Sequence, residues 1–177
     1  MLDIQHTNPK LTPAWADHVT WGDIVSFRFP VLRRAEEPAP CKRRPCLVLD
    51  RVEGPEGVKL LLCYGTSVGD ARRTGYDIDI TRDEALRAGL RKTTRFIGAR
   101  RILVSVRNGG FACHPDLGSP VIGSLEGAAF DRMNRVRARI FAEADIAEEA
   151  RRQSRVPYRR ATLRVELGRP RPRLVQR

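Results

Sequence analysis

The chain is poor in the residues on which many small enzymes depend. Its 177 residues include only three histidines, His6, His18 and His114, and these are isolated from one another. The sequence contains no H-E-x-x-H, no G-x-S-x-G and no G-x-x-x-x-G-K-[ST] motif. These absences argue against a zinc hydrolase, an α/β-type serine hydrolase and a P-loop nucleotidase.

Cysteines and long apolar runs are also scarce. The four cysteines form no C-x-x-C pair of the kind that holds zinc, so we expect small apolar fillers kept in the reduced form. No run reaches the roughly 18 uncharged apolar residues of a membrane span. The opening MLDIQHTNPK lacks the basic and apolar parts of a secretory signal. We therefore expect a cytoplasmic protein with no membrane partner, no metal and no other cofactor.

Positive charge is present in excess. Lysine and arginine number 33 against 21 acidic residues, a formal net charge of +12. Residues 151–177 hold ten arginines against one acid and carry +9, whereas residues 1–150 carry +3. Such a polybasic segment predicts a polyanionic partner, most simply nucleic acid. Only four of the cations are lysines, which is also what an arginine-biased genome would produce.

Short apolar and alternating segments predict a β-rich fold. PCLVLDRV at 45–52 and VKLLLCYGT at 58–66 flank the turn EGPEG, and this pattern predicts a hairpin. WGDIVSFRFP alternates and is closed by Pro30, which predicts another strand. The remaining strands are expected at YDIDIT, 76–81, and as two short strands around Gly98 within TRFIGARRILVSV, 94–106.

Two helices are expected. Thr81 and Glu84 form a capping box, and the short helix that they open ends at Gly89. Ser124 is positioned to cap a longer helix that continues towards Pro157. Its apolar residues recur at spacings of three and four and are expected to face a core: Leu125, Ala129, Met133, Val136 and Ile140. Arg132, Arg135 and Arg139 are expected to lie largely away from that stripe.

These elements predict a mainly β fold with α (α+β). We expect a small, strongly bent antiparallel sheet or partly open barrel, plugged by a short helix and a C-terminal helix. The expected domains are an N-terminal arm at 1–20, a barrel domain at 21–141, and a helical extension with a basic tail at 142–177.

The hairpin brings polar residues together at one rim. Arg44 begins the second strand, and Thr66 and Ser67 end the third, so hairpin pairing makes them neighbours. A guanidinium beside hydroxyl groups suits a phosphate. The alternative is an arginine that caps a strand end and a threonine that turns a loop. Asp77 and Asp79 share one strand face; they are either a carboxylate pair for a metal or ordinary solvent-facing aspartates.

Five segments in order resemble the PemK/MazF family of bacterial toxins, ribonucleases of toxin–antitoxin pairs. The resemblance covers about residues 22–140 and rests on GDIVSFRFP (22–30), RRPCLVL (43–49), GTS (65–67), GYDIDI (75–80) and AGLRKTTRFIGARRILVSV (88–106). The loop after the first strand lacks the Gly-Ser-Glu type sequence common in the family. The N-terminal arm and everything beyond about residue 141 have no counterpart in its compact members.

The resemblance implies an SH3-like barrel, usually a homodimer, that cuts single-stranded RNA sequence-selectively without a metal. It places Arg44 and Thr66 as catalytic residues, with Ser67 as a secondary candidate. The implied reaction is attack of the ribose 2′-oxygen on phosphorus, leaving a 2′,3′-cyclic phosphate and a 5′-hydroxyl end. An acidic antitoxin is the implied protein partner.

Other cations near this rim are candidates for RNA binding. They are Arg33, Arg34, Lys42, Arg43, Arg72 and Arg73, and each is as readily explained as a solvated charge. An alternative function is a non-catalytic nucleic-acid-binding module on the same barrel that binds through its arginine-rich tail. A third is an interaction adaptor whose long helix pairs with another chain.

Overall fold

The computed structural model describes residues 13–30, 42–67 and 73–155. Contacts divide the chain into two units, Met1–Ala142 and Glu143–Arg177. The first unit contains the sheet and the candidate site. In the second, the described residues are helical, with side chains bonded one turn apart, such as Arg152 to Glu148 at 2.6 Å. The predicted RNA contacts Arg33, Arg34 and Arg72 lie outside the described residues.

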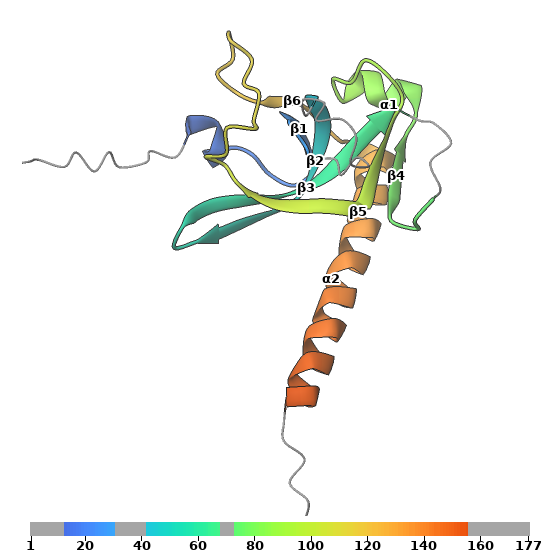
Figure 1. The fold of residues 1–177 in the computed structure, drawn as a ribbon. Coiled ribbons are helices and arrows are strands. Elements are labelled where there is room, and N and C mark those ends of the chain that lie inside the picture. The colour runs from blue at the N-terminus through green and yellow to red at the C-terminus, as the bar shows by residue number, and fades with distance from the viewer. Residues whose placement is uncertain (1–12, 31–41, 68–72, 156–177) are drawn as a thin grey trace, which may run out of the picture. The chain divides into compact units, whose positions relative to one another are not determined.

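Six antiparallel strands form one sheet in the order β4-β5-β3-β2-β1-β6 (Figure 1). A mostly β, α+β fold is therefore confirmed, and its central hairpin β2–β3 is the predicted one. The bounds are η1 Ala14–Asp17, β1 Asp23–Phe27, β2 Arg44–Gly54, β3 Gly57–Ser67, β4 Asp77–Ile80, α1 Arg82–Arg87, β5 Thr94–Ser105, β6 Val121–Ser124 and α2 Gly127–Arg155.

Successive strand residues point to opposite faces of the sheet, and both faces are buried in a hydrophobic core. One face forms the first core, where Phe27, Cys46 and Tyr64 pack with Trp15 of η1. The other face forms the second core, where Leu47 and Phe96, among others, pack against α1 and α2. Each strand that crosses the sheet thus serves two cores, which explains the continuous apolar runs in β2 and β3.

The short helix α1 follows edge strand β4, and the residues after it contact β6 at the other edge of the sheet. The capping box of Thr81 and Glu84 is present, and the chain leaves the helix at Gly89 with φ of +73°. A Cβ on Gly89 would lie 2.1 Å from the carbonyl oxygen of Ile122 in β6. Because α1 directly follows edge strand β4 and meets β6 at the opposite edge, the sheet curls into a small barrel-like form. Only glycine has both the conformation and the space for this contact.

Two predicted elements differ from the structure. The segment 94–106 was expected as two strands around Gly98, but β5 is one strand with a register shift at that point. Ser124 was expected to cap the long helix, but it ends β6, and α2 begins at Gly127. The strand β6 has only four residues, too few for a period-two pattern to stand out.

The long helix α2 faces the second core as predicted. Three residues of its apolar stripe are buried, Ala129 at 1% exposed, Met133 at 0% and Ile140 at 4%, and Val136 is partly buried against the same core. Leu125, which was expected in the stripe, precedes the helix and is buried in the same core at 4% exposed. Arg132 differs from expectation, since it is half-buried rather than directed away. Within the described residues, no helix is both long and apolar enough to cross a membrane.

Two of the three described cysteines agree with the expectation of apolar fillers, and Cys113 does not. Cys46 and Cys63 are buried and free, one in each core, whereas Cys113 is exposed and free. Burial raises the pKa of the Cys46 thiol to about 12 and also raises that of Cys63 well above its usual value. These two thiols therefore stay protonated at neutral pH and do not act as nucleophiles.

Candidate active site

A row of cross-strand neighbours crosses one end of the sheet on the first-core face. Phe27 pairs with Arg44, Thr66 pairs with Arg95, and Arg95 pairs with Asp79. The β2–β3 register places Cys46 opposite Tyr64, and two further residues along each strand bring Arg44 opposite Thr66. We call Arg44, Thr66, Arg95 and Asp79 the rim row. Directly opposed residues share a face, so these four side chains lie side by side.

The close approach of β2 and β3 at the rim depends on Gly65. A Cβ at this position would lie 2.3 Å from the carbonyl oxygen of Pro45 and 2.9 Å from a ring carbon of Phe96. Neither a backbone carbonyl nor a fully buried ring has room to withdraw. Glycine between Tyr64 and Thr66 therefore sets the spacing at which Thr66 meets Arg44.

Arg44 is half-buried and rests on an aromatic ring. Its guanidinium carbon lies 5.4 Å from the ring centre of Tyr64, within cation–π range. The ring of Tyr64 meets Phe29 edge-on, with 5.2 Å between centres. Among the described residues, no carboxylate pairs with Arg44. The Tyr64 ring thus orients a guanidinium whose hydrogen-bond donors are not taken up by a described acid.

Arg100 lies over the same ring, 5.5 Å from its centre. It is placed there by the register shift in β5, where Tyr64 pairs with Ile97 but Cys63 pairs with Arg101. The unpaired residues 98–100 bulge out of the ladder. Arg100 is exposed, so Tyr64 brings together two guanidinium groups from separate strands.

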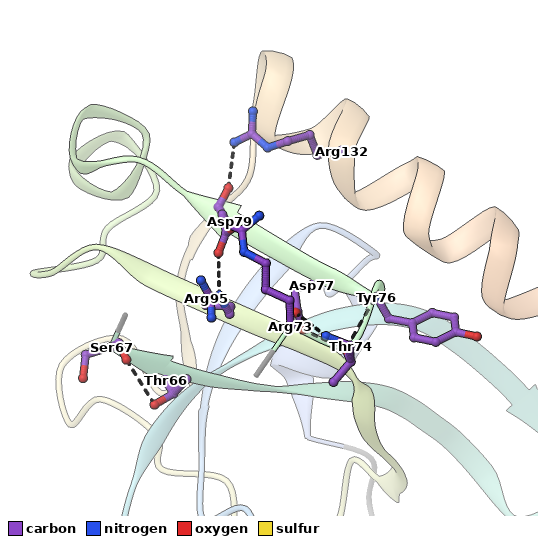
Figure 2. Close-up of polar contacts among 9 residues, drawn as sticks. All are labelled: Thr66, Ser67, Arg73, Thr74, Tyr76, Asp77, Asp79, Arg95 and Arg132. Atoms are coloured by element: carbon purple, nitrogen blue, oxygen red, sulfur yellow. Dashed lines mark hydrogen bonds and ion pairs between the residues drawn. The ribbon is translucent and has the colours of Figure 1, made fainter. Parts of the chain in front are cut away.

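Thr66 and Ser67 end β3 but direct their side chains differently. Thr66 shares the first-core face with Tyr64, and its Oγ1 donates to the carbonyl oxygen of Ser67 at 3.3 Å (Figure 2). Ser67 pairs with Thr94, and strand alternation places both on the second-core face. The hydroxyl of Thr66 is thus adjacent to Arg44, whereas that of Ser67 faces the other side of the rim.

The far half of the rim row is internally paired. Arg95 Nε donates to Asp79 Oδ1 at 2.6 Å, and Arg73 Nη2 lies 3.2 Å from Asp79 Oδ2 (Figure 2). The Arg95 side chain is only 8% exposed. Its hydrogen bond to Asp79 raises the pKa of the Arg95 guanidinium. Asp79 is therefore a structural counter-ion and not simply a solvent-facing aspartate.

Helix α2 supports this half from behind. Arg132 Nη2 donates to the backbone oxygen of Asp79 at 3.0 Å and to Glu84 Oε2 at 2.5 Å (Figure 2 shows the first contact). The bond from Arg132, with help from the Thr81 amide, lowers the pKa of Glu84 to about 2. Glu84 is thus ionised at neutral pH and links the α1 cap to α2.

The other predicted residues fall into two groups. Lys42 and Arg43 are exposed and directly precede Arg44, where they are free to meet a polyanion. Arg73 is exposed but paired with Asp79. Asp77 accepts from both the amide and the hydroxyl of Thr74, at 2.8 and 2.9 Å, and so shapes the entry to β4. In the described parts of the chain, no group of three or more His, Cys, Asp or Glu is placed to share a metal ion.

Three residues of the site were not predicted: Tyr64, Arg95 and Arg100. Tyr64 had a usable signal, because it stands two residues before Thr66 and must share its face. Arg95 had no sequence signal, because its place in the site depends on the β3–β5 register. The position of Arg100 depends on a bulge, which no local pattern in the sequence GARR predicts.

The chain resembles solved structures at low similarity. The structure of MazF (Form-I) from Deinococcus radiodurans matches with a TM-score of 0.42 and 11% identity, over 70% of this chain and 96% of that one. No protein-family model and no curated protein matches the sequence. At this similarity the likeness shows neither a family nor a function for this chain.

Proposed function

We propose that this chain is a metal-independent endoribonuclease that cleaves single-stranded RNA sequence-selectively at the Arg44–Thr66 half of the rim row. The observation that carries the proposal is the β2–β3 register, in which Cys46 pairs with Tyr64, so that both strands continued by two residues bring Arg44 beside Thr66 at the sheet end. A guanidinium without a described counter-ion stands there beside a hydroxyl group. This is the donor set that a phosphodiester requires.

The reaction is a transesterification. The ribose 2′-oxygen forms a bond to phosphorus and releases its proton to water. The bond from phosphorus to the 5′-oxygen then breaks, and that oxygen takes up a proton from water. The products are a 2′,3′-cyclic phosphate and a 5′-hydroxyl end.

Arg44 acts on the charge that builds up on the non-bridging oxygens of the phosphorane. Its ordinary pKa is too high for an easy proton transfer, so it stabilises charge and is not the proton donor. Preorganised donors of this kind contribute about 3–4 kcal/mol each. Tyr64 holds the guanidinium in place before RNA arrives, and Thr66 Oγ1 turns from the Ser67 carbonyl to donate to the phosphate.

Flanking cations would guide the RNA backbone. Lys42 and Arg43 lead into Arg44, and Arg100 lies over the same Tyr64 ring as Arg44. Together they would bind phosphates on either side of the cut, with affinity that falls as salt rises.

The five ordered motifs support a role as the toxin of a toxin–antitoxin pair. An acidic antitoxin would cover the basic rim and block access to Arg44. A second copy of the chain would pair through exposed apolar residues on the outer half of the sheet, where Leu103 is 54% and Val52 41% exposed. Sedimentation equilibrium would measure the predicted dimer, and a monomer at all concentrations would contradict it.

The decisive experiment maps the ends of a mixed RNA after incubation with the protein in EDTA. We expect new 5′-hydroxyl and 2′,3′-cyclic phosphate ends at a recurrent sequence, and none with Arg44→Ala. Arg107→Ala, an exposed arginine near the hairpin turn, is the matched control. Salt-sensitive binding without any cleavage would instead favour a non-catalytic RNA-binding module, and removal of residues 151–177 would then abolish binding.

A further inference from the structure

A pocket of about 380 Å³ lies beside the end of β3, on the second-core face of the rim. Three cations line it: Arg82 on α1, and Arg91 and Lys92 in the turn between α1 and β5. Among the described residues that line it, none is acidic. The pocket is therefore electrostatically suited to an anion.

The floor of this pocket is apolar. Ala85 and Leu90 are buried, and Leu86 presents a side chain that is 64% exposed in a position to cover a flat group. Cations around an apolar floor match a nucleotide, whose phosphate is charged and whose base is largely apolar on its faces. A free inorganic anion would leave the apolar surface unused.

Hydrogen bonds hold the walls of the pocket in place. The amide of Leu90 donates to the Ala85 oxygen at 2.8 Å, which fixes the turn against α1. Thr94 Oγ1 donates to the Lys92 oxygen at 2.9 Å, and Thr94 pairs across the sheet with Ser67. The backbone that carries these cations is thus tied to the end of β3, so little reorganisation is needed for binding.

Ser67 connects the pocket to the candidate active site. It lines the pocket, and the preceding residue in β3 is Thr66, whose side chain lies beside Arg44 on the other face. A strand of RNA that passes over the end of β3 would therefore leave Thr66 and enter the pocket at Ser67.

A second pocket, of about 350 Å³ between α1 and the start of α2, offers a contrast. Its lining includes the carboxylates Glu84 and Glu126 beside a single cation, Arg87. It lacks the positive charge that the first pocket has, although the two have similar volume.

We propose that the pocket lined by Arg82, Arg91 and Lys92 is a nucleotide subsite for the RNA strand whose scissile phosphate lies at Arg44 and Thr66. The cations bind the next phosphate, and Leu86 covers the base. Ser67 acts as a contact between the two positions. This inference rests on the proposed function and assigns the residues that would bind the nucleotide next to the cleaved bond.

The test measures binding and does not depend on cleavage. A short single-stranded 2′-deoxyuridine oligonucleotide has no 2′-nucleophile, and its Kd is followed by fluorescence anisotropy over a range of salt. We expect Arg91→Ala/Lys92→Ala to weaken binding by about tenfold or more, from the loss of charge-assisted bonds. The slope of log K against log salt should fall by about 0.7, since the double variant loses one single-strand phosphate contact.

Two further variants separate a subsite from a general positive field. Leu86→Ala changes no charge, and we expect it to weaken binding by about threefold with the salt slope unchanged. Arg87→Ala removes a cation from the same helix outside the pocket and should leave both quantities as in the wild type. Equal losses in Arg87→Ala and the double variant would overturn the subsite.

Failure of the two proposals can be told apart. If the double variant binds the oligonucleotide as well as the wild type while RNA cleavage persists, the subsite is wrong and the nuclease stands. If the pocket variants weaken binding but the wild type never cleaves RNA, the subsite stands as part of a binding module and the nuclease is wrong.

Discussion

The two arginines on either side of Thr66 belong to one cross-strand row but have different surroundings. Arg95 is almost buried and bonded to Asp79, which in turn holds Arg73. Arg44 is half-buried, rests on Tyr64, and has no carboxylate partner among the described residues. The difference shows how a sheet edge can use one residue type in two ways. The paired half stiffens the rim, whereas the guanidinium of Arg44 has no carboxylate among the described residues to pair with.

The comparison predicts the largest effect at Arg44. We expect Arg44→Ala to lower the cleavage rate about 10³-fold, because a fixed cation at the phosphorane is lost. The melting temperature should stay that of the wild type, since no described ion pair is broken. Rates on a fixed RNA and thermal unfolding would be measured together, with Arg107→Ala as the control. A loss of cleavage accompanied by a marked fall in the melting temperature of Arg44→Ala would show that Arg44 is structural.

The reverse pattern is expected at Arg95. Arg95→Met removes the partner of Asp79 inside the sheet end, so the melting temperature should fall by several degrees, with activity lost in proportion to unfolding. Circular dichroism melts of this variant and of Arg107→Met provide the comparison. A variant that melts like the wild type but fails to cleave would show that Arg95 acts on the RNA. The distinction between a structural Arg95 and a catalytic Arg44 would then be wrong.

A smaller effect is expected at Thr66. Thr66→Val keeps the shape but removes the donor, and we expect the rate to fall about tenfold to a hundredfold. Thr66→Ser keeps the hydroxyl and should retain most of the rate. Single-turnover kinetics would distinguish the two variants, and equal rates for valine and serine would exclude the hydroxyl from the reaction.

The smallest expected effect is on the pH dependence of stability, through the contact between Glu84 and Arg132. The pKa of Glu84 falls from 4.5 to about 2 in the fold, chiefly through its bond from Arg132. A lowered carboxyl pKa adds stability above pH 4.5, and this is lost as pH falls towards 2. We expect Glu84→Gln to cost about 1 kcal/mol at pH 7, limited by solvent screening. Urea unfolding across that range should show the two proteins converging at low pH.

Much of the frame was predictable because its signals are local. The β2–β3 hairpin follows from apolar runs around a Gly-Pro turn, and the start of α1 from the Thr81 and Glu84 spacing. Hairpin pairing then placed Arg44 beside Thr66 without further information. The strand β6 was missed because its four residues, which follow Pro120 and end in a serine, resemble a helix entry as much as a strand.

Features that depend on pairing between distant segments could not be predicted. The position of Arg100 comes from a three-residue bulge that only the β3–β5 register reveals. The pairing of Asp79 with Arg95 needs the β4–β5 register. Ser67 is a different case, because strand alternation already implied that it could not face the same side as Thr66.

The most direct measurement of the central claim is a double-mutant cycle on kcat/KM for RNA cleavage in EDTA, using Arg44→Ala, Thr66→Val and the double variant. If both side chains hold one phosphate, the double variant should be hardly slower than Arg44→Ala alone, because Thr66 cannot act on a phosphate that has lost its cation. Losses that multiply independently, or full cleavage by Arg44→Ala, would contradict a shared phosphate at the rim.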